Sequence, residues 1–157
     1  MRKRIVSVCL ATLLMTGISL SATQEISAAD EKVIDGSQLT HESESVGYDT
    51  KITRGKYLLT GYSKVTKLGK EKIYAGGTTV ATEKVDSVQI AVTVERAKEE
   101  DTSWEIYTGW QKENLDTDRV ASNRTLYVDG GYYYRVRCTH AANSDMSSSF
   151  TNGIYIE

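Results

Sequence analysis

The stretch from Asn123 to His140 is the most informative about the architecture and reads Asn-Arg-Thr-Leu-Tyr-Val-Asp-Gly-Gly-Tyr-Tyr-Tyr-Arg-Val-Arg-Cys-Thr-His. Every second residue is apolar or aromatic on each side of an Asp-Gly-Gly break, as expected of strands that bury one face. The inward positions are Leu126, Val128, Tyr132, Tyr134, Val136 and Cys138. Gly130 and Gly131 can adopt positive φ without a Cβ clash. The stretch therefore predicts two strands joined by a tight corner.

This spacing resembles the corner between strands E and F of fibronectin type III and other immunoglobulin-like domains. The resemblance implies that a tyrosine at the start of the second strand folds its hydroxyl back onto the corner backbone. Its position assigns that role to Tyr132, with Leu126, Gly130 and Gly131 completing the structural corner.

The rest of the chain after residue 52 is also typical of strands. Alternation is clearest in residues 85–96, where Val88, Ile90, Val92 and Val94 share one face. Residues 57–68, 70–80 and 104–111 also have strand character, whereas the polar residues 112–122 are expected to form a loop. No window shows helical spacing of apolar residues. We therefore predict an all-β domain over 52–157, an immunoglobulin-like antiparallel two-sheet sandwich of about seven or eight strands.

The N-terminal residues 1–29 have the pattern of a secretory signal peptide. A basic start is followed by an apolar run from Ile5 to Leu20 and by the small residues Ser27, Ala28 and Ala29. Residues 30–51 are polar, and we expect a flexible arm in which His41 is solvated. The expected protein is secreted and extracellular, and it is not attached to a membrane once the signal peptide is removed.

The charge balance argues against nucleic acid as a partner. The chain has 19 basic and 21 acidic residues. Cleavage after Ala29 would remove Arg2, Lys3, Arg4 and Glu25, leaving 16 basic and 20 acidic residues and a net charge of −4. A mildly acidic domain lacks the basic footprint that nucleic acid requires.

Few residues suggest chemistry. Cys138 is the one cysteine after the expected cleavage. It could be a buried thiol, an intermolecular disulfide or a nucleophile beside His140, and its inward position favours the buried thiol. Cys138 and His140 alone are too few ligands for zinc, and Asp116 with Asp118 offers at most a weak calcium site. We expect no metal, no cofactor and no catalytic residue.

Tyrosine is the unusual feature of the composition, with ten Tyr against one Phe. Four of them alternate onto expected outward faces: Tyr107, Tyr127, Tyr133 and Tyr155. With Arg135 and Arg137 beside them they would form an aromatic-basic strip suited to a glycan or a protein. The alternative is that outward tyrosines only form cross-strand pairs.

Three functions follow from these observations. The leading hypothesis is a non-catalytic extracellular module that binds glycan, cell wall or a surface protein. The second is a self-associating structural or matrix protein with exposed strand edges. The third is an enzyme that uses Cys138 and His140.

The whole chain resembles an uncharacterised family of small secreted proteins of clostridia and related Gram-positive bacteria. The resemblance is carried by residues 33–36 (Val-Ile-Asp-Gly), 52–55 (Ile-Thr-Arg-Gly) and 131–136 (Gly-Tyr-Tyr-Tyr-Arg-Val). It implies secretion and a β fold, and it supplies no functional residue.

The signal-peptide interpretation makes a direct prediction. Because the small residues at positions 27 and 29 fit the cleavage site, secreted material should begin at Asp30. N-terminal sequencing or intact mass measures this, and a start upstream of Leu20 would contradict it.

Overall fold

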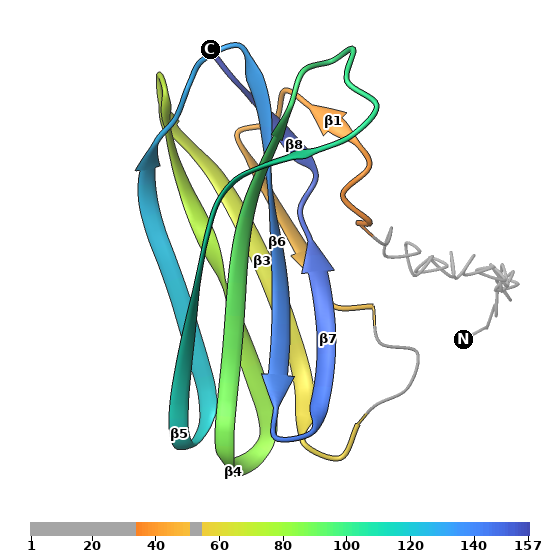
Figure 1. Ribbon diagram of the computed structural model, residues 1–157, viewed down its shortest axis with the longest axis vertical. Coiled ribbons are helices and arrows are strands. Elements are labelled where there is room, and N and C mark those ends of the chain that lie inside the picture. The colour runs from red at the N-terminus through yellow and green to blue at the C-terminus, as the bar shows by residue number, and fades with distance from the viewer. Residues whose placement is uncertain (1–33, 51–54) are drawn as a thin grey trace, which may run out of the picture. The chain divides into compact units, whose positions relative to one another are not determined.

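The computed structural model describes residues 34–50 and 55–157, and every regular element in these residues is a β-strand (Figure 1). The strands are β1 (Leu39–Thr40), β2 (Glu44–Tyr48), β3 (Leu58–Gly69), β4 (Lys72–Ala97), β5 (Glu105–Tyr127), β6 (Tyr132–Ala142), β7 (Asp145–Phe150) and β8 (Gly153–Ile156). The all-β class is confirmed, and eight strands agree with the expected number. The predicted signal peptide lies outside the described residues.

The strands form one strongly curled mixed sheet, a half-barrel, with the order β1-β8-β6-β4-β3-β2. β5 pairs with β4 and β7 pairs with β6. The β1–β8 pair is parallel and the other pairs are antiparallel. The expected division into two separate sheets is therefore not what the structure shows. The reason is that β4 pairs with β3 through its first part and with β6 through its second part, which keeps all strands in one sheet.

β4 and β5 together form a long ribbon that bends in the middle. Residues 72–80 of β4 pair with 119–127 of β5, and residues 85–96 pair with 105–117. The register shifts between Val80 and Val85, where both strands turn at the same end of the sheet (Figure 1). The two arms of each strand then run along opposite sides of the core.

The polar residues 112–122, expected to be a loop, are part of β5. Sequence alternation is weak here because β5 is an edge strand: it pairs only with β4 among the described strands, and most of its side chains are exposed. A ladder of backbone hydrogen bonds can hold such a strand without an apolar face.

The interior confirms the expected strand faces. Val88, Ile90, Val92 and Val94 are fully buried. The core continues with residues from the first arm of β4 and from β6 and β8: Ile73, Ala75, Tyr134, Val136, Cys138, Ile154 and Ile156. The opposing sides approach closely where glycine replaces a side chain. A Cβ at Gly77 would lie 2.7 Å from the Cys138 sulfur, so a larger residue would force the two sides apart.

Side chains from the first arm of β5 cover the free edge of its second arm. Lys112 Nζ donates to the Ala121 carbonyl at 3.2 Å, and Asn114 Nδ2 donates to the Arg119 carbonyl at 3.2 Å. Trp110 Nε1 adds a bond to Ser122 Oγ at 3.0 Å. The first two bonds satisfy the carbonyl groups of Ala121 and Arg119, so this part of the edge is protected against pairing with another strand.

Part of the segment expected to be a flexible arm belongs to the sheet. β1 pairs with β8, and β2 pairs with β3 over its full length. The sequence did not predict β2, because its inward positions are Ser45 and Gly47 and therefore show no apolar alternation. A Cβ at Gly47 would overlap the Phe150 carbonyl, so a large apolar residue cannot stand there.

The corner before β6 forms as expected, but with a different tyrosine. Gly131 has φ of 82°, and its amide donates to the Ile156 carbonyl at 2.8 Å. The hydroxyl that returns to the corner belongs to Tyr134, which donates to the Asp129 carbonyl at 2.9 Å. The assignment of this role to Tyr132 is wrong. Tyr132 shares the same strand face, but its ring packs under the Arg96 guanidinium instead.

Removal of the Tyr134 hydroxyl tests the corner. Tyr134→Phe should lower the free energy of unfolding by about 1 to 2 kcal/mol, because the partly buried Asp129 carbonyl loses its donor. Urea unfolding measures this. Tyr132→Phe is the matched control and should change stability little; a larger loss in the control than in Tyr134→Phe would contradict the assignment.

Candidate functional site

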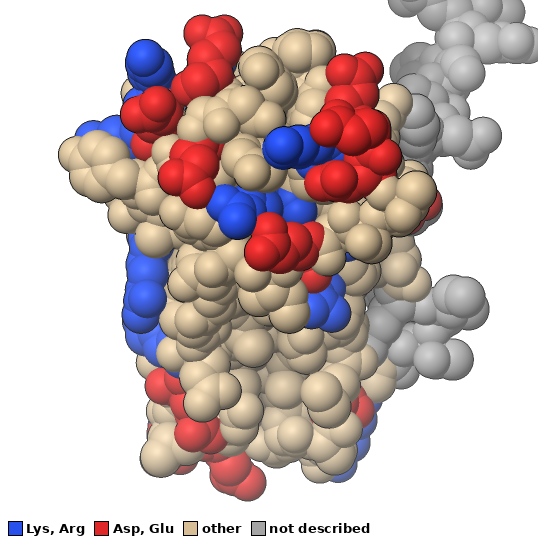
Figure 2. Space-filling model, turned by 45° about the horizontal axis from the view of Figure 1, so that its top comes forward, with Lys and Arg blue, Asp and Glu red and all other residues tan. Residues whose placement is uncertain are grey.

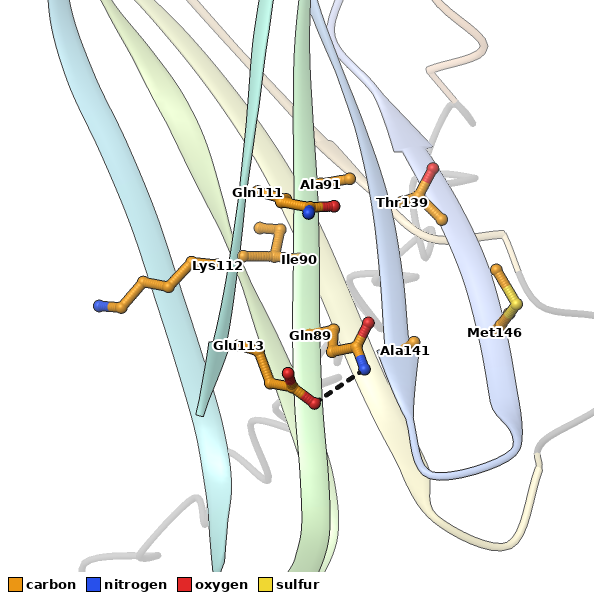
Figure 3. A pocket seen from close by; sticks show the side chains of 9 residues that line it. All are labelled: Gln89, Ile90, Ala91, Gln111, Lys112, Glu113, Thr139, Ala141 and Met146. Atoms are coloured by element: carbon orange, nitrogen blue, oxygen red, sulfur yellow. Dashed lines mark hydrogen bonds between the residues drawn. The ribbon is translucent and has the colours of Figure 1, made fainter. Parts of the chain in front are cut away.

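A shallow groove of about 460 Å³ crosses the outer face of the sheet where β5, β4, β6 and β7 lie side by side (Figure 3). Strand pairing places its residues in rows, because Gln89 is opposite both Glu113 and Ala141, and Ala91 is opposite both Gln111 and Thr139. The lining is Gln89, Ile90, Ala91, Gln111, Lys112, Glu113, Thr139, Ala141 and Met146.

One end of the groove carries an ordered polar network. Glu113 Oε1 accepts from Ser87 Oγ at 2.6 Å and from Gln89 Nε2 at 3.0 Å, and Gln89 Nε2 also reaches Ser87 Oγ at 3.1 Å. These bonds hold the amide and the carboxylate toward each other across β4 and β5 (Figure 3). Among the described residues, the second oxygen of Glu113 and the Gln89 amide oxygen have no hydrogen-bond donor. Both can accept from a ligand.

The middle of the groove is flat and weakly polar. Ala91 and Ala141 form its floor with Thr139, and Met146 stands at the side with 64% of its surface exposed. The Lys112 side chain points away from the groove (Figure 3). The arrangement offers an apolar platform with hydrogen-bonding groups at one end, a combination found in small-molecule sites.

The structure does not bring the predicted tyrosines together. Tyr127 is 77% exposed as expected, but it lies on the second arm of β5, opposite Lys72. Tyr133 is only 5% exposed, because Tyr155 and His41 pack against its ring at centroid distances of 5.1 and 5.8 Å. The aromatic-basic strip with Tyr127 beside Tyr133 is therefore not formed.

Tyr107 also differs from its expected outward position. The pairing shifts between Val94 and Glu95, so Val94 is opposite Thr108 while Glu95 is opposite Ile106. Tyr107 is the extra residue of this bulge, and its ring packs edge-on against Tyr134 at 5.6 Å. A bulge changes which residues face inward, and alternation in the sequence cannot reveal it.

Arg135 and Arg137 meet at a buried carboxylate. Glu95 is 6% exposed and pairs with Arg135 Nε at 2.7 Å and with Arg137 Nε at 3.3 Å. Arg135 also donates to the Gly36 carbonyl at 2.6 Å and lies over Trp104. Arg135 thus binds the N-terminal segment to the sheet and lines a second hollow of about 320 Å³.

Sequence reasoning missed the contact of His41 with this region. His41 follows β1, and its Nε2 lies 3.3 Å from the Tyr133 hydroxyl, with its ring also against Tyr155. No sequence signal pointed to it, because the contact depends on the pairing of β1 with β8.

Cys138 is the buried thiol that its inward position indicated. The side chain is fully buried, and burial raises the pKa of its thiol to about 12. A thiolate is the reactive form of cysteine, so this side chain is not a nucleophile at neutral pH.

His140 is fixed in a neutral form inside the core. The ring is fully buried, with Nδ1 2.8 Å from Thr79 Oγ1 and Nε2 2.8 Å from Ser149 Oγ. Thr79 donates its one hydroxyl hydrogen to the Gln89 carbonyl at 2.9 Å. Nδ1 must then carry the proton and donate to Thr79, while Nε2 accepts from Ser149. Burial lowers the pKa of His140 to about 4.

The described residues hold no cluster of three or more His, Cys, Asp or Glu side chains that could bind a metal ion. Asp116 and Asp118 lie at the bend of β5. Within the described part of the chain, no helix is long and apolar enough to cross a membrane.

No protein-family model matches this chain, and no curated protein matches its sequence. The resemblance to secreted clostridial proteins stays a prediction.

The buried imidazole predicts an acid-sensitive stability. An unfolded histidine has a pKa near 6.5 and the folded one about 4, so the unfolded state binds more protons between these values. Stability is complete above about pH 6.5 and falls as the pH decreases toward 4, by about 3 kcal/mol in total. Urea unfolding at pH 7.0 and 4.5 measures this loss.

A direct observation of the ring separates His140 from other acid-sensitive groups. Its nitrogen NMR signals should remain those of a neutral ring protonated at Nδ1 down to about pH 5. The His41→Gln variant identifies the signals of the other histidine of the chain. Protonation of His140 near pH 6.5 in the folded protein would contradict the prediction.

Proposed function

We propose that this protein is a secreted, non-catalytic binding module and that the groove over β5, β4, β6 and β7 is its ligand site. The observation that carries the proposal is the ordered pair of Gln89 and Glu113 beside a flat floor of Ala91 and Ala141. The tyrosines expected to face outward do not form this site, because the fold disperses them.

A neutral glycan chain is the ligand that this groove fits best. A carboxylate and an amide held side by side accept hydrogen bonds from adjacent hydroxyl groups, and the alanine floor accommodates the apolar face of a sugar ring. Figure 2 shows that side chains of both charges gather at the upper end of the molecule, while the broad face below them carries few. Among the residues that line the groove, only Lys112 and Glu113 are charged, and the Lys112 side chain points away from it (Figure 3). A strongly charged partner therefore has little to pair with in the groove.

The lining supports a binding role over a hydrolytic one. Glycoside hydrolysis commonly uses two carboxyl groups on opposite sides of the bond. Among the described residues that line the groove, Glu113 alone is acidic. Its carboxylate is held by Ser87 and Gln89, as expected of a group that orients a ligand.

Retention of the purified protein tests this proposal. Insoluble peptidoglycan, mucin and whole producer cells are incubated with it at low and high salt, and soluble neutral polysaccharides are tested by affinity gel electrophoresis. Ala91→Trp should abolish retention because the indole fills the groove, and Glu113→Gln should weaken it by about tenfold through loss of a charged acceptor.

Glu44→Gln is the matched control, because Glu44 also accepts from a hydroxyl across two strands, at Thr66 Oγ1, but lies on β2 outside the groove. It should bind as the unmodified protein does. The proposal is wrong if no surface retains the protein, or if retention is unchanged in Ala91→Trp while circular dichroism shows the same fold.

A further inference from the structure

The first arm of β5, residues 105–115, has an unprotected edge. This arm pairs with β4 on one side, and no other described strand pairs with its second side. The second arm of β5 differs, because Lys112 and Asn114 donate to its Ala121 and Arg119 carbonyl groups. An uncovered edge offers backbone donors and acceptors to another strand.

Two exposed apolar side chains mark the ends of this arm. Ile106 is 64% exposed and Leu115 is 67% exposed. They lie on the same outer face of the sheet, because they stand opposite Glu95 and Ser87 of β4, two outward positions. A single exposed apolar residue is ordinary. These two stand at equal distances from Gln111 once the bulged Tyr107 is left out of the pairing, and such a pair on a free edge is self-complementary.

We propose that the first arm of β5 pairs antiparallel with the same arm of a second copy of this chain, around a twofold axis at Gln111. Leu115 then stands opposite Ile106 of the other copy, and Glu113 stands opposite Gly109. Lys112 stands opposite Trp110, and Tyr107 is left out as a bulge. The same residue is left out in the pairing of β5 with β4.

This register is selected by the faces and charges of the arm. Residues 109, 111, 113 and 115 face outward, and so does Ile106 beyond the bulge, so the outward residues of both copies meet one another. A shift by one residue would place outward side chains against inward ones. In the chosen register the Ile106 and Leu115 contact forms twice, and between residues 106 and 115 no two like charges are directly opposite.

Pairing would also join the two grooves. Gln111 lines the groove and lies at the proposed axis, so the outer faces of both copies would become one continuous surface. The dimer proposal depends only on the unpaired edge of β5, so the test of the dimer is independent of whether the groove binds a ligand.

Sedimentation velocity over a hundredfold range of concentration tests the dimer, on protein purified from the host in its processed form. The unmodified protein should shift from monomer to dimer as its concentration rises. The double variant Ile106→Lys with Leu115→Lys should weaken dimerisation by at least about tenfold, because lysine at both ends opposes strand addition. The matched control is Leu59→Lys with Leu68→Lys, two exposed leucines of β3, which should dimerise as before.

A cysteine at the axis tests the register. In Gln111→Cys the two thiols face each other across the axis, so mild oxidation should give a disulfide-linked dimer at least about tenfold faster than Glu83→Cys, an exposed control at the bend of β4. Cys138 is buried and does not interfere. A concentration-independent monomer, or equal cross-linking in both cysteine variants, would overturn the proposal.

Discussion

Backbone pairing along both sides of β4 shapes the whole sheet. β4 has strands on both of its sides over nearly its whole length, β3 and β5 beside its first arm and β6 and β5 beside its second. Because buried backbone groups must be paired, the neighbours have to follow its bend. The single curled sheet, the groove on its outer face and the free edge of β5 all result from this arrangement.

The interior adds a polar link between the two sides of the sheet. His140 on β6 joins Thr79 on the first arm of β4 to Ser149 on β7. Each of its ring nitrogens has one hydrogen-bond partner, so burying the neutral ring lowers the stability of the fold little. Gly61 makes room for it, since a Cβ there would overlap the imidazole ring. The residue that looked most like a catalytic group is therefore a packing element of the core.

The number of tyrosines in the sequence did not predict where their side chains lie. Their number suggested an exposed binding strip, but most of the tyrosines have structural contacts. Tyr134 closes the corner, Tyr107 packs against it, and Tyr133 is covered by Tyr155 and His41. The candidate ligand site instead uses amides, alanines and one carboxylate. In the sequence these residues do not indicate a binding site, because only the pairing of neighbouring strands brings them together.

Local sequence patterns were enough to predict the all-β class, the inward faces of residues 88–94 and 134–138, the corner at Gly131 and the burial of Cys138. These features follow from the alternation of apolar residues and from the backbone freedom of glycine, and both can be recognised within a single stretch of sequence. The sequence pattern did not predict that β4 continues through its bend, that β1 and β2 join the sheet, or that Gln89 and Glu113 meet. Those features depend on pairing between residues distant in the chain, and the period of one strand contains no information about its partner.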